Sequence, residues 1–546
     1  MTTPTTSTET LLLRGGRVFT ADPDRPWAES VLVVDGQIHA LDAPAPEGAT
    51  VVDLDGAFVL PGFVDAHTHL VEMGAAAGEV ALVDAADIGE IQARVAAAAA
   101  EGRERVIGNG WLYPALGGRQ PHRALLDAVV PDVPVYLQAN DLHSTWVNSA
   151  ALRELGIDAH TPDPVGGTIE RDENGEATGL LSEMAALGLA RSFLAGQVTD
   201  ADRDAWLRTA CARYLADGVT TVVDMGVEAH DLAAFERALA AGDLPLRIVG
   251  HWLIKPAATA AENLAQVEAA IEHARRLDGD RLRVTGIKIM ADGVIDSCTA
   301  SMAKPYADGS NAAPIWDREA LTPVVVAADA AGLQIAIHAI GDEASAIALD
   351  ALEEAIRVNG PRERRHRMEH LEVVSTDGIA RLARLGVVAS MQPVHADPAI
   401  QDNWRAMLGD ERVERGYPWR EITDAGGVLA FGTDAPTAPH PPLPNMYVAT
   451  TRRSALVEGL PANTPHLAVP LAEALTHATR DAAYASRLEG VVGTIAPGMS
   501  ADLVVLDSDP FATAPEDLLT TQVLRTFVAG VAQGDSQRAE GSSVRV

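Results

Sequence analysis

The residues of this sequence that are best suited to chemistry are two histidines, His67 and His69, in the segment FVDAHTHL (63–70). In an extended strand, residues i and i+2 point to the same face, so both imidazoles are expected to point at one place. Two neutral imidazoles at a strand end are good ligands for a divalent cation. A His-x-His pair alone is weak evidence, because most such pairs are surface histidines or hydrogen-bonded core histidines. The metal interpretation therefore needs further ligands from elsewhere in the chain.

Such residues occur near the C-terminal ends of later apolar runs. They are Lys288 in LRVTGIKIM (282–290), His338 in LQIAIHAI (333–340), His370 in RHRMEHLE (365–372) and Asp434 in VLAFGTDAP (428–436). A barrel of parallel strands presents its catalytic groups at this end of each strand. One histidine there would be unremarkable in a packed core, but packing does not explain all of these placements together with the histidine pair. The pattern favours a metal site.

The elements that must position these residues alternate between apolar β-type runs and amphipathic helical stretches. Besides the runs already named, β-type runs occur at 219–225, 246–253 and 387–394, and helices are expected at 201–217 and 323–331. Eight alternating units specify an α/β fold of the TIM type, a (β/α)8 barrel, better than an open sheet. We assign residues 63–484 to this barrel.

Both ends of the chain carry further β-type runs. Three lie before residue 62, separated by turns such as Gly15-Gly16 and Asp35-Gly36, and two lie at 501–510 and 522–533. A few strands at each terminus do not form a stable sheet alone. We therefore expect residues 10–62 and 485–533 to join into one small β-sandwich domain, with disordered tails at 1–9 and 534–546.

The distance between the first two barrel strands is far longer than one helix requires. We expect an inserted subdomain at about 105–195, with short β signals around a helix at 147–155. An insertion after the first strand enters at the C-terminal mouth of the barrel, where it would form a lid or a pocket wall.

Composition excludes several classes of protein. The 546 residues carry a formal net charge of −34, and no basic stretch offsets it, which argues against nucleic-acid or anionic membrane partners. The chain has only two cysteines, Cys211 and Cys298, so a framework of disulfide bonds is not expected. No signal peptide or long apolar run is visible, so a cytoplasmic protein is expected. The sequence has no Gly-x-Ser-x-Gly or Walker-type motif, so serine nucleophile and phosphoryl-transfer chemistry lack support.

The motifs VDAHTH, GIKIMADG, IAIHAIGD, RMEHLE and FGTDAP together resemble the amidohydrolase superfamily of metal-dependent hydrolases. Within the insertion, GNGW (108–111), VPVYLQANDLHSTWVNSAALRELGI (133–157) and GGTIERDENGEATGLLSE (166–183) resemble amidohydrolase family 3, the subgroup that contains N-substituted formamide deformylase. The terminal segment VVGTIAPGMSADLVVLD (491–507) resembles the closing β-domain of that family. These motifs are specific for the family and the fold, but not for the substrate.

The resemblance implies two divalent metal ions, for which zinc is the expected element. His67 and His69 would bind the more buried ion, with Asp434 near it, and His338 and His370 would bind the second. Lys288 would bridge the two ions as a carbamylated lysine, because an ammonium repels cations whereas a carbamate is a carboxylate. The alternative for Lys288 is an ordinary buried or ion-paired lysine.

Five further residues are candidates for the site. Glu183 is either a ligand or substrate contact, or a carboxylate favoured at a helix N-terminus. His395 either polarises a substrate oxygen or is a hydrogen-bonded loop histidine. Trp111 and His143 either line the substrate pocket or pack the lid, and Asp292 is a substrate-binding candidate without an assigned role.

The implied reaction is hydrolysis of a non-peptide C–N bond in a small-molecule amide or formamide. Asp434 would transfer the proton as general acid–base, and His395 or His338 would support the oxyanion. Alternatives are a mononuclear deaminase or cyclic-amide hydrolase, an esterase or lactonase on the same barrel, and a metal-free scaffold relative. A homodimer is compatible with the resemblance, although no residue pattern fixes an interface.

Overall fold

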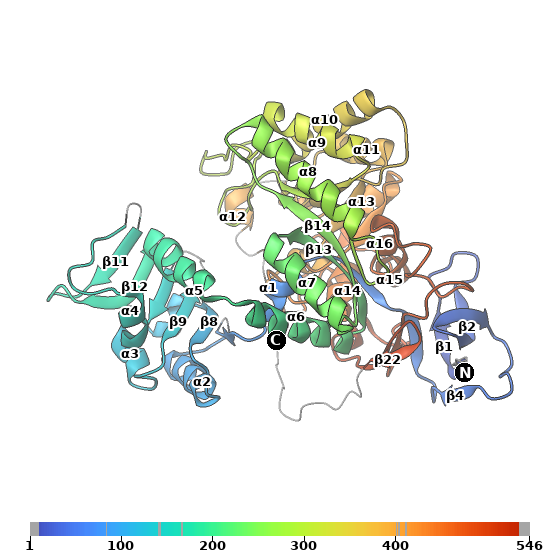
Figure 1. Ribbon diagram of the computed structural model, residues 1–546, viewed down its shortest axis with the longest axis horizontal. Coiled ribbons are helices and arrows are strands. Elements are labelled where there is room, and N and C mark those ends of the chain that lie inside the picture. Colours follow the sequence, from blue (N-terminus) through green and yellow to red (C-terminus); the bar gives the residue numbers. More distant parts are fainter. Residues whose placement is uncertain are drawn as a thin grey trace, which may run out of the picture. The chain divides into compact units, whose positions relative to one another are not determined.

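The computed structural model describes residues 10–82, 84–139, 144–164, 167–399, 401, 404–409 and 412–533. The chain divides into two compact units. One unit consists of the chain up to Met73 and from Leu207 onward, and the other runs from Gly74 to Trp206. The first unit contains a parallel barrel and a mixed terminal sheet, and the second is an inserted subdomain (Figure 1).

Eight parallel strands form a nearly closed barrel. In chain order, which is also their order around the sheet, they are β6 (Phe63–Thr68), β13 (Val219–Val227), β14 (Arg247–Ile254), β15 (Leu282–Met290), β16 (Gln334–Ala339), β17 (Arg367–His370), β18 (Val388–Met391) and β19 (Leu429–Phe431). The backbone N–H groups of Thr433 and Asp434 donate to the carbonyl of His67, which joins the chain after β19 to β6. The predicted (β/α)8 barrel is confirmed, and the candidate ligands lie at or just beyond strand ends.

Helices connect successive strands on the outside of the barrel, as Figure 1 shows for α8 to α11. They include α6 (Asp200–Ala216), α7 (Ala229–Ala241), α8 (Ala260–Arg276), α9 (Arg318–Ala330), α10 (Asp342–Asn359), α11 (Thr376–Leu385), α13 (Trp419–Asp424), α14 (Pro442–Thr451), α15 (Leu471–His477) and α16 (Arg480–Ala485). Local sequence sets their ends: Thr259 caps α8 in a capping box with Glu262, and Gly386 ends α11 in the left-handed conformation.

Strands from both chain termini share one mixed sheet. The strands are β1 (Thr10–Phe19), β2 (Trp27–Val34), β3 (Gln37–Leu41), β4 (Thr50–Asp53), β5 (Phe58–Pro61), β20 (Leu503–Leu506), β21 (Val523–Val528) and β22 (Val531–Gln533). Strand β5 pairs with β1 in parallel and with β20 in antiparallel orientation, so it links the N-terminal and C-terminal strands. The joining of N-terminal and C-terminal strands that the sequence predicts is therefore confirmed, as one mixed sheet.

The inserted subdomain has a sheet and a core of its own. Its six strands, in the order β11-β12-β10-β9-β8-β7, are β7 (Val80–Ala81), β8 (Val106–Trp111), β9 (Val135–Ala139), β10 (Ser144–Val147), β11 (Gly167–Arg171) and β12 (Ala177–Glu183). Helices α2 (Ile88–Ala100) and α4 (Ser149–Leu155) contribute to separate apolar clusters within the unit. Within the part of the chain that the structure describes, no helix is long and apolar enough to span a membrane.

A buried ion pair joins the barrel to the terminal sheet. Arg247, the first residue of β14, is 2% exposed and donates to Asp502 at 3.0 and 3.2 Å and to the Ser500 hydroxyl at 2.8 Å. We expect Arg247→Met to lower the free energy of unfolding by about 3–5 kcal/mol, because it leaves the Asp502 carboxylate buried without its principal cation. The measurement is the thermal unfolding midpoint of the two proteins.

The matched control is Arg276→Met, which removes an exposed arginine and its ion pair with Glu236. Exposed pairs contribute about 0–1 kcal/mol, so this change should barely move the midpoint. Equal shifts in the two variants would contradict the structural role of Arg247.

Candidate metal centre

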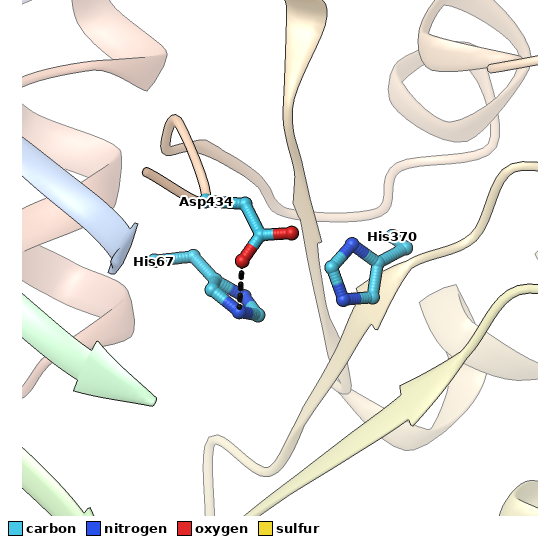
Figure 2. A group of neighbouring side chains, drawn as sticks. All are labelled: His67, His370 and Asp434. Carbon is cyan, nitrogen blue, oxygen red and sulfur yellow. Dashed lines mark ion pairs between the residues drawn. The ribbon is translucent and has the colours of Figure 1, made fainter. Parts of the chain in front are cut away.

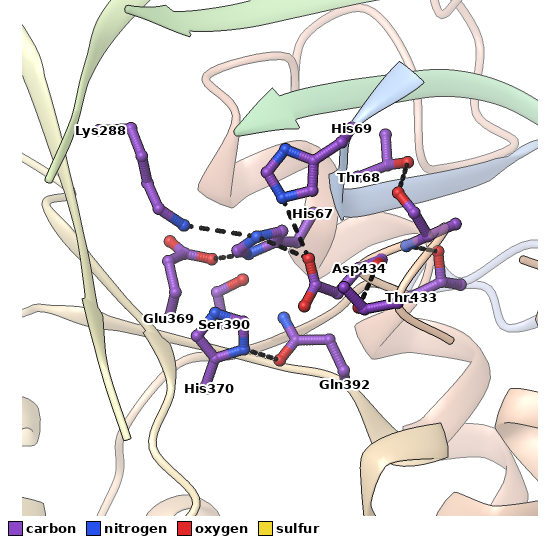
Figure 3. A network of polar contacts seen from close by, with 12 residues as sticks. His67, Thr68, His69, Lys288, Glu369, His370, Ser390, Gln392, Thr433 and Asp434 are labelled. Atoms are coloured by element: carbon purple, nitrogen blue, oxygen red, sulfur yellow. Dashed lines mark hydrogen bonds and ion pairs between the residues drawn. The ribbon is translucent and has the colours of Figure 1, made fainter. Parts of the chain in front are cut away.

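His67 and His69 both approach one oxygen of Asp434. The Nε2 atoms of His67 and His69 lie 3.3 and 3.2 Å from Asp434 Oδ1 (Figure 3). His67 Nδ1 lies 2.7 Å from Glu369 Oε2, and because a carboxylate accepts, the proton of this imidazole sits on Nδ1. Nε2, on the other side of the His67 ring, faces the Asp434 oxygen, which is the arrangement of a metal-ligating histidine with a carboxylate behind it.

Glu369 is held ionised behind His67. Arg367 donates to both of its oxygens, at 2.6 and 3.0 Å, and also to the carbonyl of Ala66 and the hydroxyl of Ser390. Burial by itself would raise the pKa of Glu369, but Arg367 and His67 outweigh burial and hold that pKa well below its usual range. The negative charge fixes the tautomer and the orientation of the His67 ring.

His338 and His370 lie next to each other with their rings 4.4 Å apart. His370 Nδ1 lies 2.9 Å from the amide oxygen of Gln392, so it donates there and leaves Nε2 free. His338 Nε2 lies 3.1 Å from the carbonyl of Gly293, so it donates there and leaves Nδ1 free. Burial lowers the pKa of both imidazoles, that of His338 to about 3, so both are neutral potential ligands.

Lys288 places its side-chain amine next to His67. Its Nζ lies 3.4 Å from His67 Nε2, and the residue is 1% exposed. Among the described residues no carboxylate lies within ion-pair distance of Nζ. Burial lowers the pKa of Lys288 to about 8, against the opposing influence of Glu369 and Asp434. A neutral amine is therefore accessible near physiological pH.

Asp434 faces three imidazoles from a left-handed backbone position, with φ at +60°. Burial raises its pKa, but His67 and His69 outweigh that effect and the pKa lies well below the usual value. Its second oxygen lies 3.7 Å from His395 Nε2, and His395 Nδ1 lies 3.6 Å from Glu372 Oε1. His395 thus stands between two carboxylates, which raise its pKa despite burial.

The donor set is chemically suited to a divalent metal ion. Ligand atoms of His67, His370 and Asp434 lie within 4.8 Å of one another (Figure 2), and so do those of His370, Glu372 and His395. Neutral imidazoles with a carboxylate form the preferred environment of borderline cations such as zinc. The residues present therefore fit a metal ion.

Asp65 and Asp292 position the loops that carry the ligands. Asp65 accepts the backbone N–H of His67 at 3.1 Å and both the N–H and the hydroxyl of Thr433, at 2.9 and 2.5 Å. Asp292 accepts the N–H groups of Ser301, Ile340 and Gly341 at 2.8–3.0 Å. Both oxygens of this substrate-contact candidate are thus occupied by the loop after β16, and the residue is 1% exposed.

The candidates from the insertion lie in the other compact unit. Trp111 is fully buried in the core of that unit and donates its indole N–H to the carbonyl of Leu137 at 2.9 Å. Glu183, the last residue of β12, is exposed with φ at +53°. His143 lies outside the described residues.

Polar residues of the centre that were not singled out from the sequence include Arg367, Glu369, Glu372 and Gln392. The signal for the first two is Arg-x-Glu within RHRMEHLE, since residues i and i+2 of a fully buried strand share a face and a lone buried charge there needs a partner. Gln392 lies in the loop after β18, and no local pattern connects it to His370.

Comparison with known proteins agrees with this geometry. A family model described as "Amidohydrolase family" matches residues 50–532. The protein LONG AFTER FAR-RED 3 of Arabidopsis thaliana is 32% identical over 97% of this chain and 92% of its own length. The N-substituted formamide deformylase of Arthrobacter pascens is 31% identical over 95% of this chain and 97% of its own.

A solved structure gives the same result. An uncharacterized metal-dependent hydrolase from Pyrococcus furiosus superposes with a TM-score of 0.75 and 27% identity, covering 92% of this chain and 99% of the other. The match of a family model to almost the whole chain, with full-length relatives above 30% identity, is decisive for the family. The chain belongs to the amidohydrolase family, whose solved relative is a metal-dependent hydrolase, and its His67, His370 and Asp434 cluster suits a divalent metal ion.

Proposed function

We propose that the protein hydrolyses a non-peptide C–N bond, of the amide or formamide type, with the help of two zinc ions. The observation that carries the proposal is the convergence of the Nε2 atoms of His67 and His69 on one oxygen of Asp434, with Lys288 Nζ 3.4 Å from the same His67 nitrogen. The name of the Arthrobacter pascens relative supports formamides as the first substrates to test.

In this proposal His67, His69 and Asp434 would hold one ion, and His338 and His370 would hold the other. Lys288, carbamylated by CO2, would supply a carboxylate shared by both. Its buried Nζ has no carboxylate partner in the described chain, and conversion to a carbamate would remove an uncompensated positive charge from the centre. When bound, the metal ions activate water and polarise the substrate carbonyl.

The remaining chemistry belongs to the side chains. Asp434 accepts a proton from the attacking water and delivers it to the leaving nitrogen as the C–N bond breaks, so that an amide and water give a carboxylic acid and an amine. His395, 3.7 Å from Asp434 and held by Glu372, donates a hydrogen bond to the carbonyl oxygen as negative charge develops. The other oxyanion candidate, His338, acts as a ligand through Nδ1, because its Nε2 already donates to Gly293.

Metal content and substrate preference together test the proposal. We expect about two zinc equivalents per chain by plasma mass spectrometry on protein purified without chelators or a metal-binding tag. We also expect faster turnover of an N-substituted formamide than of the ester with the same substituent. One equivalent would favour the mononuclear deaminase or cyclic-amide hydrolase, and preference for the ester would favour an esterase or lactonase. No metal and no activity after addition of zinc and bicarbonate would favour the scaffold.

A further inference from the structure

A cavity lies at the end of the barrel opposite the candidate metal centre. It has a volume of about 340 Å³, and its walls come from the segments that lead into β16 and β17 and from the chain after α16. The metal ligands lie at the opposite, C-terminal ends of these strands, since His338 is near the end of β16 and His370 ends β17. The cavity is therefore separate from the catalytic mouth.

Arginine dominates the cavity wall, although the chain as a whole is strongly acidic, with a net charge of −34. The ionised residues of the wall are Arg362, Arg364, Arg365, Arg487, Asp329, Glu363 and Glu489, four cations against three anions. A local excess of positive charge in such an acidic protein is unexpected for a surface selected only for solubility. Binding of a negatively charged ligand would explain this excess of positive charge in the cavity wall.

The single negative charge of Asp329 is shared by several hydrogen-bond donors, two of which are positively charged guanidinium groups. Arg364 binds it with two nitrogens at 2.8 and 3.2 Å, Arg362 lies at 2.9 Å, and Asn359 donates at 2.8 Å. His366 donates through Nε2 at 3.0 Å, since its Nδ1 accepts a backbone N–H. One carboxylate thus faces two guanidinium groups, and the Arg362 guanidinium, about one third exposed, makes a single contact with it.

The positive charge of Arg487 is not balanced by a nearby carboxylate among the described residues. Its guanidinium donates to the carbonyls of Gly332 and Arg364 at 3.3 and 2.9 Å. Within the described part of the chain it has no carboxylate at ion-pair distance, and a guanidinium has five donors. Burial, together with neighbouring Arg365 and Arg362, lowers its pKa.

Two arginines of the cavity wall also have unusual backbone conformations, which suggests that their positions serve a function. Arg365 and Arg487 have φ of +56° and +59°, a region that non-glycine residues adopt at a cost. Both project into the same cavity wall. Arg365 is bound by Glu363 and Glu489, which leaves Arg362 and Arg487 as the arginines with unused donors.

We propose that this cavity binds a small molecule that carries a phosphate group, through Arg362 and Arg487. A guanidinium matches two oxygens of a phosphate with two parallel N–H donors, and the volume is within the range of small-molecule sites. Inorganic phosphate and a phosphate monoester share this chemistry. The cavity is large for phosphate alone, so we assign it to a phosphate monoester of about nucleotide size.

Isothermal titration calorimetry on the metal-loaded full-length protein tests the proposal, with AMP, inorganic phosphate and uncharged adenosine at constant ionic strength. We expect AMP to bind with a Kd below about 1 mM, more tightly than phosphate, and adenosine not to bind. Arg362→Gln and Arg487→Gln should each weaken AMP binding about tenfold or more, because each removes charge-assisted hydrogen bonds. Arg357→Gln, at an exposed arginine paired with Glu354, should leave the affinity unchanged.

Binding of AMP at the metal centre is the competing explanation, and Asp434→Asn separates the two sites. AMP affinity retained in Asp434→Asn and lost in the two arginine variants supports the cavity. Arg362→Gln protects the test against a folding defect in Arg487→Gln, because the Arg362 side chain is partly exposed. Phosphate binding as tightly as AMP would overturn the monoester assignment. Absence of AMP binding at about 10 mM, or equal binding in wild type and both arginine variants, would overturn the site.

Discussion

Asp434→Asn is expected to reduce kcat by at least about 10³-fold while the barrel stays folded. Asparagine has nearly the same shape as aspartate, so the loop after β19 keeps its two backbone hydrogen bonds to the His67 carbonyl. The amide cannot accept a proton from water, and it does not supply the negative oxygen that faces His67 and His69 at 3.3 and 3.2 Å. Steady-state kinetics on the best formamide, with circular dichroism and thermal unfolding, measures both parts of the prediction.

Asp424→Asn is the matched control, because Asp424 is an exposed aspartate paired with Arg420 on α13. It should leave kcat within about twofold of wild type, as expected of a surface change remote from the chemistry. Turnover near the wild-type rate in Asp434→Asn would remove Asp434 from proton transfer. Loss of folding in that variant but not in the control would indicate a structural role instead.

Lys288→Ala is expected to lower both the zinc content and kcat/KM, the latter by about 10³-fold or more. In the proposed centre the carbamate is the bridge between the ions, and alanine removes it together with a buried chain of methylenes. The space left beside His67 accommodates a small carboxylate, so added formate should restore part of the activity. Plasma mass spectrometry and kinetics with and without formate provide the measurements.

Lys255→Ala is the comparison for this variant, since Lys255 is exposed and paired with Glu228. Two zinc equivalents and normal activity in the control, against about one equivalent in Lys288→Ala, would support the bridge. Lys288→Ala with full zinc content and unchanged kinetics would show that Lys288 is an ordinary buried lysine.

The sequence predicts the barrel because each strand carries its signal locally. Runs such as LRVTGIKIM and LQIAIHAI are mostly apolar, as expected of strands buried on both faces. Each observed barrel strand overlaps one of the eight predicted runs, and β13 and β14 extend past the ends of theirs. The composite terminal sheet was also predictable, since neither end of the chain has enough strands alone. The pairing of β5 with both β1 and β20 depends on three-dimensional packing and has no local signature.

The candidate site was partly predictable for the same reason. The six predicted ligands interrupt or follow apolar strands; they are His67, His69, Lys288, His338, His370 and Asp434. The structure brings His67 within 3.4 Å of both Lys288 and Asp434. The groups behind them were not evident. The Arg-x-Glu spacing indicates that Glu369 pairs with Arg367, but its contact with a histidine 302 residues away has no local signature. Asp292 binds backbone groups rather than side chains, so its positioning role has none either.

Contacts in the insertion were the least predictable. Trp111 in GNGW is of a residue type that often lines pockets, yet it packs in a core cluster that includes Leu137 and Trp146. Aromatic residues serve equally well in cores and in pockets, so residue type alone does not separate the two roles.

The shared terminal sheet also constrains how the chain is made. Strands β1 to β5 are complete by Pro61, but their partner β20 begins at Leu503, roughly 440 residues later. At synthesis rates of about 5–20 residues per second, the edge of β5 waits about 20–90 s for its partner. During that interval an unpaired, apolar strand edge is exposed on the ribosome, where it can pair with other chains. The nascent protein should therefore depend on chaperones that cover strand edges more strongly than its finished, folded form suggests.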